Sequence, residues 1–138
     1  MRLLKKIKPQ PEHLKTGIWG EKVAARFLRK EGFRVVARRV KVGRDEIDLI
    51  ARRKEQLIIV EVKTRRSEKF GRPASAINKR KRLALQRATI RYLNKLHRPP
   101  RYVRIDCIEV IGQRGDRHPA IRHLENILTL DRYQLPRK

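Results

Sequence analysis

Cysteine is nearly absent from the 138-residue sequence, and the single Cys107 excludes both an intrachain disulfide and a cysteine-based zinc site. Aromatic residues are also scarce, with three Phe, three Tyr and one Trp, so recognition of nucleic acid by stacked aromatic platforms is not expected. No apolar run is long enough to span a bilayer, and the basic N-terminal segment has no apolar core of a signal peptide. These absences predict a cytoplasmic protein.

Acidic residues are outnumbered, because 14 Asp and Glu stand against 38 Lys and Arg and leave a net charge of +24. So strong a positive field on a small protein is typical of one that binds a polyanion, and nucleic acid is the simplest candidate. The basic residues run through the whole chain, which favours this interpretation over a basic solubilising surface or a membrane-surface protein. Contacts with backbone phosphates are then expected to dominate the binding.

The length suits one domain with a single core. Residues 1–15 are basic and contain two prolines, and we expect them to form a flexible arm that either touches nucleic acid or is simply disordered. Residues 16–131 are expected to form the domain, and residues 132–138 a C-terminal tail.

Hydrophobic periodicity and turn residues predict two helices and five strands. The helices are expected over residues 16–31, with Thr16 as N-cap, and over residues 74–97. The expected strands are 33–42, 47–51, 57–60, 102–111 and, at an edge, 121–130. Short turns make the first three strands an antiparallel meander, and the intervening helix makes the fourth strand parallel to the third. The predicted fold is α/β, a mixed sheet of α-β-β-β-α-β order flanked by two helices.

Charged residues interrupt the two apolar runs of the hairpin at 46–65. Asp48 lies in the first run, and Glu61 and Lys63 follow the second. A charge in a buried strand is costly unless it is paired or binds a metal. Two carboxylates on adjacent strands can hold Mg²⁺ or Mn²⁺, and a lysine beside them can orient or deprotonate a water and offset phosphate charge. The sequence therefore predicts Asp48 and Glu61 as metal ligands and Lys63 as a catalytic residue.

This prediction depends on the register of the hairpin. A turn with an even number of residues places Asp48 opposite Glu61, and Glu46 opposite Lys63, on one face of the sheet. A slip of one residue would place the two acids on opposite faces.

Further candidates lie outside the hairpin. Glu21 falls on the apolar stripe of the first helix, where it either reaches toward the two acids or is a helix-start acid near the favourable dipole end. Lys81 falls on the apolar stripe of the second helix, and it either leans toward the acids or snorkels past the edge of the core. The expected nucleic-acid contacts are basic residues at the end of the hairpin and after it: Arg65, Arg66, Lys69, Arg72, Lys79 and Lys81.

Several segments in combination resemble one known family. They are GIWGEKVAARFLRKEGF, GRDEIDLIA, IIVEVKTRR with FGRPASAINKRKR, and RIDCIEV, which together extend from residue 17 to residue 110. The sequence is similar to the YraN family of bacterial predicted endonucleases. That family is similar to archaeal Holliday-junction resolvases within the restriction-endonuclease-like PD-(D/E)xK superfamily.

The resemblance implies a restriction-endonuclease-like core and Mg²⁺ binding at Asp48 and Glu61. It also implies a catalytic role for Lys63 and for an acid of the first helix, Glu21. Resolvases of the superfamily usually act as homodimers on branched DNA, so the expected function is a Mg²⁺-dependent DNA endonuclease, with a homodimer and branched substrates as further implications. The proline of the superfamily's name is replaced here by Ile47. The alternative is a basic nucleic-acid-binding module of the same fold that does not cut.

Overall fold

The computed structural model describes residues 11–67 and 77–130. The predictions made for Lys69, Arg72, residues 1–10 and residues 131–138 lie outside these residues. Within them the elements follow in the order α1 (Glu12–Lys30), β1 (Arg34–Val42), β2 (Asp45–Arg53), β3 (Gln56–Arg65), α2 (Lys79–Lys95), β4 (Tyr102–Ile111) and β5 (Ala120–Leu128). Neither of these helices is both long and apolar enough to cross a lipid bilayer.

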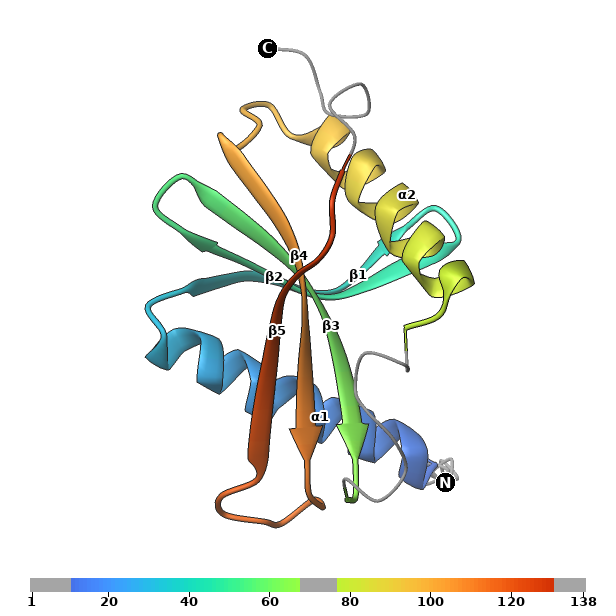
Figure 1. Cartoon of the computed structure of the whole chain (residues 1–138), viewed down its shortest axis with the longest axis vertical. Helices are drawn as coiled ribbons and strands as arrows, with labels where there is room; N and C mark the ends of the chain where they lie inside the picture. The colour runs from blue at the N-terminus through green and yellow to red at the C-terminus, as the bar shows by residue number, and fades with distance from the viewer. Residues whose placement is uncertain (1–10, 68–76, 131–138) are drawn as a thin grey trace, which may run out of the picture.

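The five strands form one mixed sheet in the order β1-β2-β3-β4-β5 (Figure 1). β1, β2 and β3 form an antiparallel meander. Helix α2 connects β3 to β4, and these two strands are parallel. β5 is antiparallel to β4. The predicted α/β class and the predicted order of helices and strands are therefore confirmed, with β3 in the middle of the sheet.

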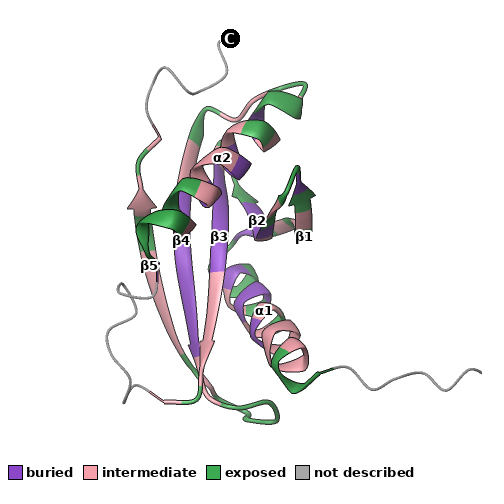
Figure 2. Ribbon diagram, turned by 90° about the vertical axis from the view of Figure 1, so that its right-hand side faces the viewer, coloured by how far each residue is buried: buried purple, intermediate pink, exposed green. Residues whose placement is uncertain are grey.

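Alternation along β3 divides the core into two parts. Ile58 and Val60 pack under α1, whereas Leu57 and Ile59 pack under α2, so the two helices cover opposite faces of the sheet. Buried positions run along β3 and β4, which have neighbouring strands on both sides (Figure 2). Both strands read as apolar runs because each of their faces is covered over part of its length.

Helix α1 begins earlier than the sequence suggested. It starts at Glu12, and the carbonyl oxygen of Pro11 accepts hydrogen bonds from the amides of Leu14 and Lys15. The expected N-cap at Thr16 is wrong because a proline at a helix start needs no N–H and has a favourable φ. One of the two prolines that suggested a flexible arm therefore initiates the helix.

Helix α2 is shorter than expected and begins with a side-chain cap. The side-chain oxygen of Asn78 accepts a hydrogen bond from the amide of Lys81, and the helix ends at Lys95 before the Pro99–Pro100 pair. The cap fixes the first turn of α2, the turn that carries Lys81.

The two outermost strands of the sheet are both irregular. Arg39 in β1 has φ +48° and Asn126 in β5 has φ +53°, a left-handed conformation that costs energy in residues other than glycine. The ladder between β4 and β5 shifts its register beside Asn126, between Ile105 and Cys107.

Asp106 ties these two strands together at the irregular position. It is fully buried, and its carboxylate accepts two hydrogen bonds from the Arg104 guanidinium at 2.8 and 2.9 Å. It also accepts the backbone amide of Asn126 at 2.9 Å, and the Nε2 atom of His123 lies 2.7 Å from it. The carboxylate of Asp106 therefore binds both the guanidinium of Arg104 and the backbone amide of Asn126, at the position where the strand ladder shifts.

Candidate functional site

The candidate site lies where β2 and β3 separate. The two strands pair in the register expected for an even turn, with Ile50 opposite Ile59, but the ladder ends at Leu49 and Val60. Beyond this point the β1–β2 hairpin turns to one side, while β3 continues beside β4 (Figure 1). The residues immediately past the end of the ladder are the two acids singled out in the sequence, which therefore flank the opening.

A cleft of about 580 Å³ opens at this separation. The first half of α1 forms one wall, and it carries the predicted acid Glu21 into the lining. The lining residues are Glu12, His13, Thr16, Gly17, Glu21, Asp48, Glu61, Val62, Thr64 and Arg66. The structure thus brings all three predicted acids to one cleft.

Helix α1 reaches the cleft because it approaches β3 very closely at one position. A Cβ atom at Gly20 would collide with the side-chain oxygen of Thr64. The missing side chain lets the helix pack directly on the strand. Glu21, the next residue, is therefore held at the wall of the cleft.

Asp48 is fixed by the backbone of β3. Its Oδ2 atom accepts a hydrogen bond of 2.8 Å from the amide of Val62, in the part of β3 that β2 no longer pairs. Burial, and then the negative charge of Glu61, raise the pKa of Asp48 to about 7. The protonated and the ionised forms of Asp48 are therefore both populated near neutral pH.

Glu61 is almost completely buried, with 3% of its surface exposed. Its Oε1 atom lies 3.2 Å from Nζ of Lys81 and 3.6 Å from Nζ of Lys63. Its Oε2 atom is buried and has no hydrogen-bond partner within the described residues. A buried carboxylate oxygen without a partner is costly, and a cation between Glu61 and Asp48 would remove that cost.

These donors fit a hard divalent cation. Asp48 and Glu61 supply carboxylate oxygens, which Mg²⁺ and Mn²⁺ prefer. Across residues 11–67 and 77–130, no three Asp, Glu, His or Cys side chains are grouped to hold a metal. Water and substrate phosphate would have to complete the coordination, as is usual for Mg²⁺.

The position of Lys81 decides between its two interpretations. Its ammonium group points from the first turn of α2 to Glu61, so it leans toward the acids. It is about one-third exposed and remains accessible from solvent. Two lysines from different elements therefore share one oxygen of the same carboxylate.

Glu21 is paired rather than free. The Nε atom of Arg39 donates a hydrogen bond of 2.8 Å to its carboxylate. This hydrogen bond raises the pKa of Arg39, and the charges of Glu46 and Asp48 add to the effect. Sequence reasoning missed Arg39, because nothing distinguishes it from neighbouring arginines except its place across from the Asp48 strand.

Glu46 does not lie opposite Lys63 as expected. Its strand partner is Lys41 of β1, since the β2–β3 ladder ends before reaching it. The predicted four-residue patch therefore loses Glu46. Lys81, from α2, takes a place beside Glu61 instead.

The predicted nucleic-acid contacts occupy different environments. Arg66 lines the cleft and is exposed, and Lys79 is exposed in the first turn of α2. Arg65 instead lies with its Nε atom 2.9 Å from the buried carboxylate of Glu109. Its charge is already matched by this acid, so it is the weakest of these candidates.

Residues 20–110 match the sequence profile of a family described as uncharacterised protein family UPF0102. A UPF0102 protein of Syntrophomonas wolfei is 36% identical over 110 residues, which cover 80% of this chain and 94% of the relative. A UPF0102 protein of Nocardia farcinica is 40% identical over 111 residues, 80% of this chain and 87% of the relative. UPF0102 protein CT2262 of Chlorobaculum tepidum is 41% identical over 113 residues, 79% of this chain and 88% of the relative.

Proposed function

The chain belongs to the uncharacterised protein family UPF0102, the YraN family expected from its sequence, and we propose that it is a metal-dependent endonuclease that hydrolyses phosphodiester bonds in DNA. The observation that carries the proposal is the Asp48–Glu61 pair. One acid has a raised pKa, and the other has a buried oxygen without a partner among the described residues. The likeness of the sequence to the PD-(D/E)xK superfamily supports the same reaction and a restriction-endonuclease-like core.

Each side chain of the cleft has a separate task in this proposal. Asp48 and Glu61 would hold Mg²⁺ or Mn²⁺, which when bound supplies Lewis-acid activation of water and phosphate. Lys63, on the same strand face as Glu61, orients or deprotonates the attacking water. Lys81 approaches from α2 and offsets the charge that develops on the phosphate. Glu21 accepts a hydrogen bond from Arg39 and adds a third carboxylate to the lining of the cleft.

The charge of the protein supports DNA as the substrate. A net charge of +24 attracts any polyanion. Arg66 is exposed in the lining of the cleft, and Lys79 is exposed in the first turn of α2, the turn that also carries Lys81. Branched DNA as the preferred substrate and a homodimer as the acting species are parts of the proposal that rest on the likeness to resolvases.

A second candidate function is a nucleic-acid-binding module that does not cut. The observation in its favour is that Lys63 and Lys81 already compensate the charge of Glu61 without any metal. An internal ion-pair cluster of this kind holds α2 on the sheet, which is a structural task.

Incubation of the purified protein with labelled branched DNA, linear DNA and RNA separates the two functions. We expect cleavage of DNA with Mg²⁺ or Mn²⁺ and none with a chelator, because the two acids need a cation to activate water. Binding of all three substrates is measured in parallel in the chelator. Binding without cleavage of any substrate under all metal conditions would establish the module instead.

Metal binding should weaken as the pH is lowered. A protonated Asp48 must lose its proton before it binds a cation, and its pKa is about 7. The apparent Mn²⁺ affinity should therefore fall by up to about tenfold for each pH unit below that value and level off above it. Calorimetric titration with Mn²⁺ between about pH 5.5 and pH 8 measures the slope. An Asp48→Asn variant should lose both the binding and its pH dependence, and a flat profile in the wild type would contradict the assignment.

A further inference from the structure

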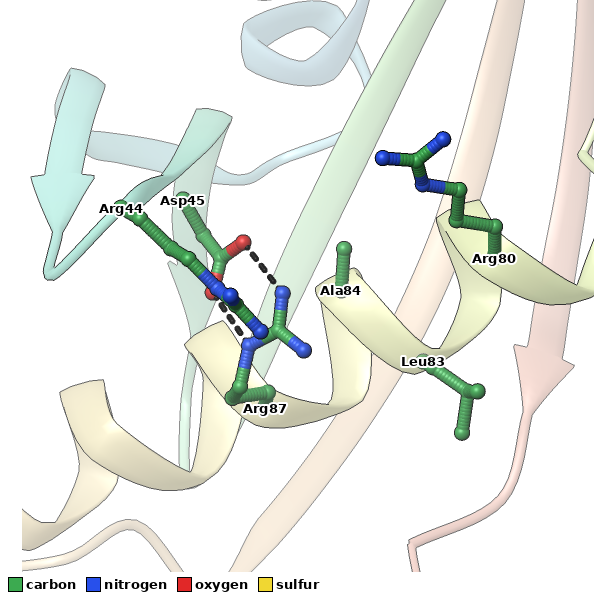
Figure 3. Close-up of a pocket in the computed structure, with 6 residues that line it drawn as sticks. All are labelled: Arg44, Asp45, Arg80, Leu83, Ala84 and Arg87. Carbon is green, nitrogen blue, oxygen red and sulfur yellow. Dashed lines mark hydrogen bonds and ion pairs between the residues drawn. The ribbon is translucent and has the colours of Figure 1, made fainter.

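A second cavity, of about 410 Å³, lies between α2 and the turn that joins β1 to β2. Three arginines and one acid line it, together with two apolar residues of α2 (Figure 3). The lining residues are Arg44, Asp45, Arg80, Leu83, Ala84 and Arg87. None of the nucleic-acid contacts expected from the sequence is among them.

One of the three arginines is fixed in place. Arg87 donates two hydrogen bonds to the carboxylate of Asp45, from Nε at 2.8 Å and from NH2 at 2.7 Å. The same interaction holds the pKa of Asp45 below its usual value. This parallel pairing joins α2 to the start of β2, and it uses the charge of the only acid in the lining.

The other two arginines have no comparable partner. Figure 3 shows no hydrogen bond or ion pair from Arg44 or Arg80 to the other lining residues. Neither side chain has one with any other described residue, and both are exposed. Arg80 precedes Arg87 by two helical turns on α2, and the small side chain of Ala84 lies between them. The cavity therefore has two arginines that form no ion pair within the described residues, although the charge of Arg44 also helps to lower the pKa of Asp45.

We propose that this cavity binds a backbone phosphate of the nucleic acid whose scissile bond lies in the Asp48–Glu61 cleft, an inference that rests on the proposed function. A guanidinium group can donate two parallel N–H hydrogen bonds to the oxygens of a phosphate. Arg44 and Arg80 make no such interaction with an acid of the cavity, so they are available for a phosphate. Leu83, which is 51% exposed at the rim, offers apolar surface to a sugar, which a site for inorganic phosphate would not need.

The cavity and the cleft share two elements. Arg80 and Lys81 are neighbours on α2, and the first lines the cavity while the second contacts Glu61. Asp45 and Asp48 are three residues apart on β2, which corresponds to about 10 Å along a strand. One DNA strand carries a phosphate for about every 3.4 Å of helix axis, so we expect the phosphate that occupies the cavity to be a few nucleotides from the scissile bond.

The test compares two double variants with the same loss of charge. Arg44→Ala with Arg80→Ala removes the two cavity arginines that form no ion pair, and Lys95→Ala with Arg98→Ala removes two exposed cations, one in the last turn of α2 and one just beyond it. DNA binding is measured by fluorescence anisotropy over a salt series in a chelator, so no cleavage is needed. Loss of one bound phosphate should reduce the slope of log affinity against log salt by about 1 in the cavity variant, and the control should change it by less than about 0.5.

The possible outcomes separate this inference from the proposed function. Equal slopes for the two double variants, or no DNA binding by the wild type, would overturn the phosphate site. A reduced slope in the cavity variant of a protein that cuts nothing would support the site while the nuclease proposal fails. Inorganic phosphate provides the last comparison. If it raises the melting temperature of the wild type but not of the cavity variant, and DNA affinity is unchanged, the site takes free phosphate and the inference is wrong.

Discussion

Replacement of Glu61 by Gln should lower the rate of DNA cleavage by roughly a thousandfold and leave DNA binding nearly unchanged. Gln keeps the size of the side chain but removes the charge that would hold the cation between β2 and β3. It also removes the negative charge beside Lys63 and Lys81, so binding in a chelator should become slightly tighter. Single-turnover cleavage with saturating Mg²⁺ and anisotropy in a chelator measure the two effects.

Glu55→Gln is the matched control, because it makes the same chemical change at an exposed position in the β2–β3 turn. It should cut DNA at the wild-type rate. Cleavage by Glu61→Gln at the rate of this control would show that the metal ligands have been assigned wrongly. A comparable loss in both variants would instead point to a general effect of charge on DNA affinity.

Replacement of Asp106 by Ala should reduce the free energy of unfolding by about 3–5 kcal/mol. The change leaves the largely buried guanidinium of Arg104 without its main partner and the amide of Asn126 without an acceptor. A buried charge that loses its partner is among the most destabilising single changes. Urea unfolding, followed by the fluorescence of the single tryptophan, Trp19, measures the loss.

Glu125→Gln provides the comparison, because Glu125 is the second acid near Arg104. It is 60% exposed and lies 3.6 Å from the guanidinium. Exposed ion pairs contribute little, so its loss should cost less than about 1 kcal/mol. Equal destabilisation by the two substitutions would mean that Asp106 does not serve as a buried anchor for β5.

Most of the fold could be predicted from the sequence because its signals are local. The apolar run of residues 57–60 and its neighbour across a short polar turn are typical of a central hairpin. Periodicity and the proline pair after residue 97 located α2 to within a few residues. The start of α1 was missed because Pro11 can break a chain or begin a helix, and its local sequence does not distinguish the two.

Three residues of the candidate site could be located for an energetic reason. Asp48, Glu61 and Lys63 stood out because charges in an apolar strand need partners, and the structure brings all three together. Arg39 and Arg87 could not be singled out in the same way among 38 basic residues. Their contacts depend on where the β2–β3 ladder ends and on which side chains meet between separate elements. The hydrophobic periodicity of the sequence carries no information about either.

The left-handed residues in the outermost strands, Arg39 and Asn126, have a consequence for how copies of the protein meet. An exposed strand edge invites another chain to extend the sheet, provided that its row of N–H and C=O groups is flat and unbroken. Here both outer rows are interrupted, and β1 is also rich in arginine and lysine. Neither edge is therefore suited to extension of the sheet by a second copy, and the residue that interrupts β1, Arg39, is also the one whose side chain binds Glu21.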